Sequence, residues 1–246
     1  MRSDNALAFF LVTLTLALWE FIVRWQEIPI YILPAPSRIL ATLFENPRLY
    51  AEASLLTLGE ALTGLALGTL AGVIVATLLG FWPRLERGVM MLAILVKSTP
   101  LVAIAPLLTI WLGFGILPKI IITGLLTFFP ILVNVLSGLG AVDPALMDTF
   151  RSWNAGKLEI YRYLRAPTAL PYLFAALKIS APLALIGAVI AEWTGASGGL
   201  GRTMWLAYTN LNLPYLFAAV FILSAAGIAL YALVNYAERR VVFWPR

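Results

Sequence analysis

Long apolar runs separated by short polar links dominate the chain. Because a helix needs about 20 mostly apolar residues to cross a membrane, these runs predict six spans, at residues 6–23, 55–81, 88–112, 119–139, 172–193 and 215–236. No soluble domain or internal repeat interrupts them, so residues 1–246 are predicted to form one transmembrane domain. Since helices satisfy their own backbone groups in lipid, the pattern predicts an all-α membrane protein.

The longest polar interruption lies between the fourth and fifth predicted spans, at residues 142–174. Asp143 followed by Pro144 is typical of a helix start, and residues 154–156 are types that accept a positive φ, which predicts a turn. Helical spacing resumes at Lys157, and Pro167 is expected to end it. The stretch therefore predicts a helix, a turn and a second helix outside the bilayer core. An amphipathic loop lying on lipid headgroups is the alternative.

Two of the predicted spans carry patterns that bear on packing and shape. In the second, Gly64, Gly68 and Gly72 recur every four residues, which favours close approach of a neighbouring helix on that face. In the third, Pro100 is expected to kink the helix near Thr99, and Pro106 to add a second kink.

Basic residues predict the orientation. With a cytoplasmic N-terminus, the inside segments hold Arg2, Arg84, Arg87, Arg151, Lys157, Arg162, Arg165, Arg239, Arg240 and Arg246, whereas the outside segments hold Arg24, Arg38, Arg48, Lys119 and Arg202. Positive residues favour the cytoplasmic side. Both termini and the 142–174 stretch are therefore expected to be cytoplasmic.

Composition narrows the possible functions. Apolar residues make up 61% of the chain and charged ones 12%, and there is no cysteine or histidine. Thiol chemistry, histidine relays and the usual zinc sites are therefore excluded, and no metal or other cofactor site is expected. The net charge of +5 fits the orientation of a membrane protein better than nucleic-acid binding. Lys157 lacks the glycine and hydroxyl residues of a phosphate-binding loop, so ATP must act through another chain.

Ionisable residues inside spans are costly and so raise functional hypotheses. Lys97, beside the expected kink, is predicted to face a translocation path, with snorkelling or a buried ion pair as the alternatives. Glu192 could gate the outer mouth or simply cap or pair at a helix end. Glu60 and Lys178 are expected to be solvated near the interface. The tentative pathway residues are Lys97, Ser98, Pro100, Asn134 and Glu192.

Several segments together resemble a known transporter family. They read LPAPSRIL from Leu33, KSTPLVAIAPLLTIWLGFG from Lys97, FFPILVN from Phe128, ALPYLFAALKIS from Ala169 and AEWTGASGGLG from Ala191. They resemble the permease subunits of bacterial type I ABC importers of the nitrate, sulfonate and taurine type. The cytoplasmic-loop pattern of that family falls on Asp148, Thr149, Phe150, Asn154, Leu164, Ala166 and Pro167, where only Pro167 is identical and Asp148 and Leu164 are conservative.

The resemblance implies a six-helix permease fold in the inner membrane, with a cytoplasmic coupling loop at residues 142–171. It implies two copies of an ATPase subunit that bind ATP and Mg, a solute-binding protein on the outer face, and no catalysis by this chain. The expected coupling residues are Asp148, Arg151, Asn154, Ala155, Gly156, Lys157 and Pro167. A permease homodimer is expected, because one chain supplies half of a two-fold pathway.

The sequence supports two classes of cargo and does not decide between them. The family resemblance implies nitrate, sulfonates or taurine, but the run IGAVIAEWTGAS resembles relatives that move hydroxymethylpyrimidine or riboflavin. A channel or ion-coupled carrier without ATP is the alternative function. An intramembrane protease lacks support, because the chain has no histidine and Asp4, Asp143 and Asp148 lie outside the spans.

Overall fold

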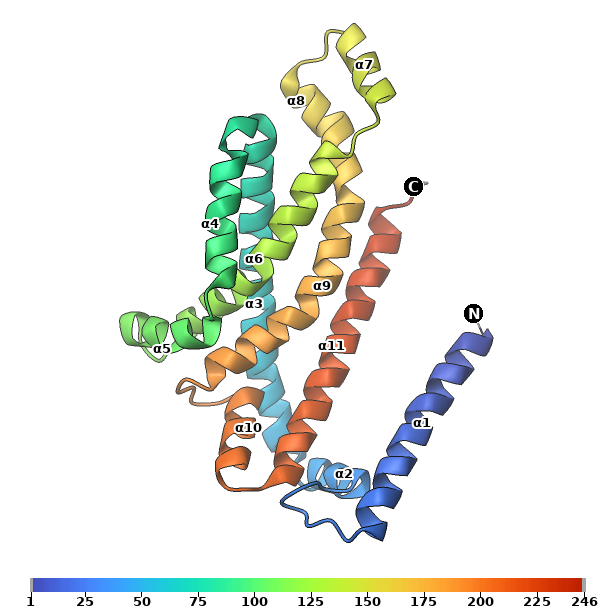
Figure 1. The fold of residues 1–246 in the computed structure, drawn as a ribbon, viewed down its shortest axis with the longest axis vertical. Coiled ribbons are helices and arrows are strands. Elements are labelled where there is room, and N and C mark those ends of the chain that lie inside the picture. Colours follow the sequence, from blue (N-terminus) through green and yellow to red (C-terminus); the bar gives the residue numbers. More distant parts are fainter. Residues whose placement is uncertain (1, 245–246) are drawn as a thin grey trace.

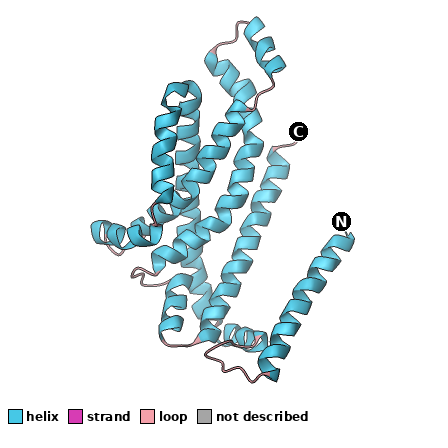
Figure 2. Ribbon diagram, in the orientation of Figure 1, coloured by secondary structure: helices cyan, strands magenta, loops and turns pink. Residues whose placement is uncertain are grey.

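The computed structural model describes residues 2–244, and it describes no side chains for residues 2–6, 8 and 9. Within the described part the chain is built of helices joined by short loops, with no strand (Figure 2). The all-α prediction is confirmed.

The helices follow one another with few breaks. In order they are α1 (Arg2–Trp25), α2 (Pro36–Glu45), α3 (Pro47–Phe81), α4 (Glu86–Ser98), α5 (Leu101–Leu112), α6 (Leu117–Gly140), α7 (Pro144–Ser152), α8 (Lys157–Ile160), α9 (Ala166–Glu192), α10 (Leu200–Thr209) and α11 (Leu213–Val241). A 3-10 turn, Pro83–Leu85, precedes α4, and a π-helical turn, η2 (Tyr161–Arg165), joins α8 to α9.

The described residues contain four helices long and apolar enough to cross a membrane. They are α3, α6, the continuous segment Lys157–Glu192 and α11, and the bent pair α4 and α5 makes a fifth if it counts as one span. The first predicted span, 6–23, falls within α1, where several side chains lie outside the described ones. The helix of the fifth predicted span begins earlier than residue 172, because α9 continues from α8 and η2.

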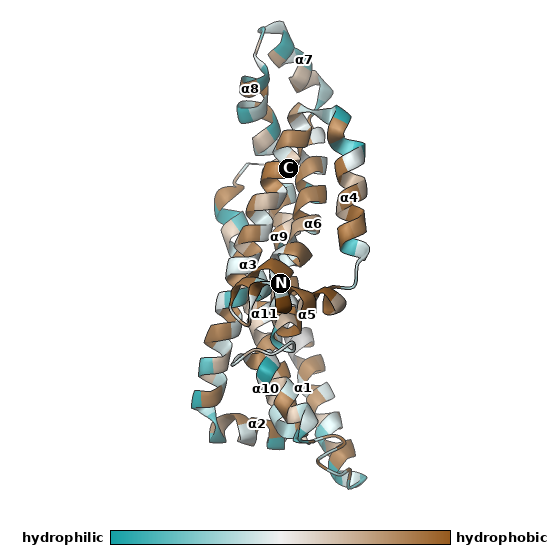
Figure 3. Ribbon diagram, turned by 90° about the vertical axis from the view of Figure 1, so that its left-hand side faces the viewer, coloured by the Kyte–Doolittle hydropathy of each residue, from teal (hydrophilic) through white to brown (hydrophobic). Residues whose placement is uncertain are grey.

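The arrangement separates two polar ends. Residues 143–165, which include α7, α8 and η2, project beyond the bundle at one end and are called the elbow below (Figure 1). α2 and α10 lie at the opposite end, while the free ends of α1 and α11 point toward the elbow. Hydrophilic residues gather at these two ends (Figure 3).

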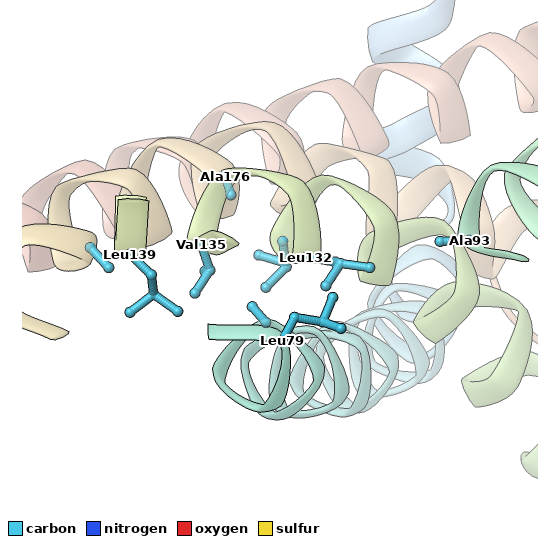
Figure 4. Packing of buried hydrophobic residues seen from close by; sticks show 9 residues of the cluster. Leu79, Ala93, Leu132, Val135, Leu139 and Ala176 are labelled. Carbon is cyan, nitrogen blue, oxygen red and sulfur yellow. The ribbon is translucent and has the colours of Figure 1, made fainter. Parts of the chain in front are cut away.

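Three helices, α3, α6 and α9, form the centre. Their apolar contacts at the elbow end include Leu79 of α3, Leu132 and Val135 of α6 and Ala176 of α9 (Figure 4). A β-carbon added at Gly64, Gly68 or Gly72 would overlap α6. The predicted close approach along the glycine face of α3 is thus confirmed, and its partner is α6.

In the third predicted span the helix is broken into two, where the sequence predicted a kink. α4 ends at Ser98 and α5 begins at Leu101, and the two helices meet at 91°. Pro100 starts α5 and Thr99 is extended (φ −76°, ψ 129°), because a residue before proline avoids the helical region. Pro106, expected to add a second kink, lies inside α5 without ending it.

The prediction that Pro167 ends the second helix of the polar stretch is wrong. Helix α9 runs through this proline to Glu192. The N–H of Ala166 bonds to the carbonyl of Tyr161, five residues back, so the chain is widened just before the ring. A π-helical turn of this kind accommodates a proline without breaking the helix.

Candidate functional site

The elbow begins with a well-capped helix. The Asp143 side chain accepts a hydrogen bond from the N–H of Ala145 at 2.9 Å, and Pro144 occupies the first helical position. This side chain satisfies a backbone donor that the helix itself leaves free. The predicted start of the first elbow helix is confirmed.

A tight turn joins α7 to α8. Asn154 has φ +55°, and the N–H of Ala155 donates to the carbonyl of Phe150 at 3.1 Å, as in a Schellman helix end. Gly156 instead has φ −68°, and its N–H donates to Glu159 Oε2 at 2.6 Å. The turn therefore exists where the sequence predicted it, but only Asn154 uses a positive φ.

The outer surface of the elbow is exposed and partly apolar. Trp153 is 71% exposed, Leu146 and Leu158 are also exposed, and the rings of Phe150 and Trp153 lie 5.7 Å apart. Exposed apolar side chains gathered on a segment that is predicted to lie outside the bilayer are typical of a protein contact. Of the predicted coupling residues, Asp148, Arg151, Asn154, Gly156 and Lys157 are exposed, while Ala155 and Pro167 are half-buried.

The base of the elbow is bound to the end of α3. The hydroxyl groups of Tyr161 and Thr77 are 2.8 Å apart, and the Tyr161 ring lies 5.2 Å from the ring of Phe81. Arg165 Nη1 donates to the carbonyl of Gly80 at 3.2 Å, one of the carbonyls that the end of a helix leaves unpaired. The elbow is therefore bonded to α3 and is also continuous with α9.

A buried ion pair joins α3 to α6 at the end opposite the elbow. Lys119 Nζ lies 2.5 Å from Glu60 Oε1, and Glu60 is only 3% exposed. The expectation that Glu60 is solvated at the interface is therefore wrong. Lys119, assigned to an outside link, instead sits in the first turn of α6 and reaches the carboxylate.

Glu192 is fully buried beside this pair and holds the start of α10. Its Oε1 accepts from Thr57 Oγ1 at 2.6 Å, and its Oε2 accepts from the N–H groups of Gly201 and Arg202. Gly199 has φ +105°, and a β-carbon there would overlap the carboxylate. The glycines of the SGGLG run thus bring backbone donors onto Glu192, so the capping and pairing alternative describes its contacts.

Lys178 also lies in an ion pair rather than in solvent. Its Nζ pairs with the carboxylate of Glu238, which is buried, and the pair links α9 to α11. The expectation of interfacial solvation is wrong here too. The pairing joins residues 60 positions apart, a distance at which helix periodicity carries no information.

Three of the remaining pathway candidates lie at the break between α4 and α5. Lys97, Ser98 and Pro100 are exposed there, and Lys97 Nζ lies 4.5 Å from the centre of the Phe129 ring of α6. Asn134, further along α6, is half-buried and donates to the carbonyl of Pro130 at 2.8 Å. Glu192 lies apart from this group, in the buried contacts with Thr57 and α10.

Sequence reasoning missed Thr57, Lys119, Tyr161 and Arg165 as connecting residues. One signal was available for the buried pair. Glu60 stands four residues before Gly64 and so shares the face of α3 that packs on α6. Among the side chains that the structure describes, no group of three metal-ligating residues lies together.

Several known proteins are similar in sequence to this chain over nearly its whole length. The chain is 35% identical to the formylaminopyrimidine transport permease protein ThiX of Halalkalibacterium halodurans, over 100% of this chain and 98% of that protein. It is 30% identical to the riboflavin transport system permease protein RibX of Chloroflexus aurantiacus (94% and 87%). It is 27% identical to the putative aliphatic sulfonates transport permease protein SsuC of Bacillus subtilis (93% and 84%).

The fold is also that of solved permeases. A chain of the MetNI methionine ABC transporter, in an inward-facing conformation, superposes with a TM-score of 0.67 at 23% identity, over 79% of this chain and 94% of that chain. Residues 68–243 match the family described as "Binding-protein-dependent transport system inner membrane component". The protein therefore belongs to the family of binding-protein-dependent transport system inner membrane components, the permease subunits of ABC importers.

Proposed function

We propose that two copies of this chain form the translocation pathway of an ATP-driven importer, in which a separate ATPase subunit moves the elbow. A solute-binding protein delivers cargo at the opposite end, where α2 and α10 lie. The exposed elbow carries this proposal, because its apolar surface has no partner within the described chain. ATP and Mg are bound by the ATPase subunit, and this chain catalyses no reaction.

The contacts of the elbow support a mechanical role. A force on α7 reaches α9 through α8 and η2, which are continuous with it, and reaches α3 through Arg165 and Tyr161. α3 in turn packs against α6 along its glycine face. The three central helices therefore respond as a unit, as closure of two domains around a pathway requires.

The orientation is part of the proposal. The elbow end carries most of the basic residues that lie outside the apolar segments, and a basic excess favours the cytoplasm. Arg151, Lys157, Arg162 and Arg165 belong to the elbow itself. Both termini and the elbow are then cytoplasmic, with α2, α10 and the Glu192 contacts at the outer face.

Solute passes the break between α4 and α5 in this proposal. A cation over an aromatic ring, as at Lys97 and Phe129, offers a charged donor beside a flat apolar surface. Ser98, Pro100 and Asn134 complete this part of the path. Glu192 acts at a distance from the solute by holding α10 against α3, because both of its oxygens already accept hydrogen bonds.

The cargo we propose is a small heteroaromatic compound of the pyrimidine type. Identity is higher to the permease named for formylaminopyrimidine transport than to the one named for aliphatic sulfonates, at 35% against 27%. The Lys97 and Phe129 pair suits a polar aromatic ring through stacking and one charge-assisted hydrogen bond. A small sulfonate is the second candidate, favoured by the positive charge of Lys97.

Replacing Lys97 tests the pathway. A Lys97→Ala variant should lower cargo uptake into proteoliposomes about tenfold, because a hydrogen bond from a charged group is worth roughly 1.5–3 kcal/mol. Lys97→Arg, which keeps the charge, should retain most of the uptake. If the Lys97→Ala complex assembles, hydrolyses ATP and transports cargo at the normal rate, Lys97 does not line the path.

Isolation of the tagged chain from membranes tests the proposed class of transporter. An importer permease should bring down an ATPase subunit in a fixed ratio, and uptake should require ATP. A channel or an ion-coupled carrier should be isolated without one and should transport in its absence. That second outcome would replace the proposal.

A further inference from the structure

A basic cavity lies between the elbow and the end of α3. It measures about 260 Å³ and is lined by Arg151 of α7, Lys157 of α8 and Arg165 of η2, together with Phe81, Pro83 and Tyr161. Three cationic side chains from three successive elements thus share one cavity. The side chains that line it include no carboxylate.

The three cationic side chains of this cavity have hydrogen-bond donors that are not used within the described chain. Among the described residues, Lys157 forms no ion pair, and Arg151 pairs only with Asp148, at 3.4 Å and with both side chains largely exposed. Arg165 uses Nη1 for the carbonyl of Gly80, while its Nε is buried without a partner among the described residues. An anion with several acceptor oxygens would satisfy these donors together.

The surroundings of the cavity match the boundary between membrane and water. Phe81 ends the apolar helix α3, and the next residue, Trp82, is exposed, as is Leu85. Tryptophan at a span end is typical of the headgroup level. The cavity therefore lies at the depth where lipid phosphates lie, on the proposed cytoplasmic side.

A second cavity adjoins the first and extends along α4 and α6. It measures about 330 Å³, shares Gly80, Pro83 and Arg165 with the basic cavity, and continues along Met90 of α4 and Leu136 and Leu139 of α6. Glu86 is the one carboxylate among its lining residues, and it does not line the basic cavity. The apolar side chains of Met90, Leu136 and Leu139 offer contacts to the first part of an acyl chain whose headgroup lies among the three cations.

We propose that these two cavities bind one anionic phospholipid of the inner leaflet, with its phosphodiester among Arg151, Lys157 and Arg165. Basic pockets beside membrane helices on the cytoplasmic face are suited to such headgroups. The bound lipid bridges α7 and η2 and so fixes the elbow against α3. This site goes beyond transport itself, and it rests only on the proposed placement of the elbow at the cytoplasmic surface.

Native mass spectrometry of the full chain, isolated in mild detergent with whichever subunits remain bound to it, tests the site. The complex is titrated with phosphatidylglycerol and, separately, with zwitterionic phosphatidylcholine. Phosphatidylglycerol should be retained preferentially, and the double variant Arg151→Gln and Lys157→Gln should lose this preference by about tenfold or more, since each basic group near the surface is worth about 1 kcal/mol. The double variant Arg84→Gln and Arg162→Gln is the matched control, because it also removes two exposed positive charges at this end and neither residue lines the cavities.

Three results would overturn the site. Equal retention of the two lipids shows that no anionic headgroup is selected. An equal loss in the Arg84→Gln and Arg162→Gln double variant shows that selection comes from overall charge. Displacement of phosphatidylglycerol by inorganic phosphate at an equal concentration identifies a free anion as the ligand. Each readout is the ratio of two bound lipids and not a transport rate. The outcome of this test therefore does not depend on whether the protein transports cargo with ATP.

Discussion

Replacing Lys119 with methionine should destabilise the folded chain by about 3–5 kcal/mol. The change removes the ammonium group 2.5 Å from Glu60 Oε1 and leaves a carboxylate that is only 3% exposed without its counter-charge. An uncompensated buried charge costs more than the ion pair contributed, because both groups were desolvated in the folded state. The measurement is denaturant-induced unfolding of the purified chain in mild detergent.

Two further variants make this prediction specific. Arg48→Met removes one member of a solvated ion pair, Arg48 with Glu52, and should change the free energy of unfolding by about 1 kcal/mol or less. Adding Glu60→Gln to Lys119→Met should restore part of the lost stability, because the buried charge is gone. Wild-type stability in Lys119→Met would show that Glu60 is not buried against α6 as described.

Replacing Gly156 with proline should reduce cargo uptake about tenfold or more and end the stimulation of ATP hydrolysis by cargo. Proline removes the N–H that donates to Glu159 Oε2 at 2.6 Å, a hydrogen bond to a charged group worth roughly 1.5–3 kcal/mol. It also restricts Ala155, whose N–H completes the end of α7. The two elbow helices then lose their fixed angle, while the ATPase subunit itself is unaltered.

Gly156→Ala is the matched control for the elbow. Gly156 has φ −68°, and an added β-carbon would meet only Glu159, at 3.6 Å, so alanine keeps both the conformation and the N–H. Uptake in this variant should stay close to normal. If Gly156→Pro transports cargo and responds to it as well as Gly156→Ala, the rigidity of the elbow has no part in coupling.

The local features of the elbow could be predicted from the sequence because they depend on neighbouring residues. Asp143 caps a helix through a backbone group two residues away, and Asn154 accepts the positive φ that ends it. The glycine face of α3 was also predictable, since spacing by four residues places the glycines on one side whatever packs there. Each of these inferences needs only a few consecutive turns of chain.

The interior polar contacts could not be predicted in the same way. The partners Glu60 and Lys119, or Lys178 and Glu238, are joined by the packing of separate helices, and periodicity does not say which helices are neighbours. Lys119 was also assigned to the basic residues of an outside segment, and a residue in such a segment is not expected to form a buried ion pair. The passage of α9 through Pro167 escaped prediction because it depends on the π-helical turn before the proline.

The right-angled break at Thr99 shows how far the geometry of a bent helix can be predicted from the sequence. The sequence indicates a bend, since Pro100 disfavours a helical conformation at the residue before it. The angle of 91° depends on how α5 packs, and Ala105 of α5 lies in a buried cluster with Ile122 of α6 and Ala191 of α9. The position of the break is thus set by the local sequence, whereas the direction of α5 after the break is set by its contacts with other helices.

Cross-linking from the elbow measures the central claim most directly. The chain has no cysteine, so Trp153→Cys at the exposed elbow and Tyr208→Cys at the opposite end each supply one attachment point for a thiol-linked photo-cross-linker. In native membranes, the account predicts that the ATPase subunit is captured from position 153 and not from position 208. Capture from position 208 alone, or capture of no ATPase from position 153 in membranes that actively transport cargo, would contradict it.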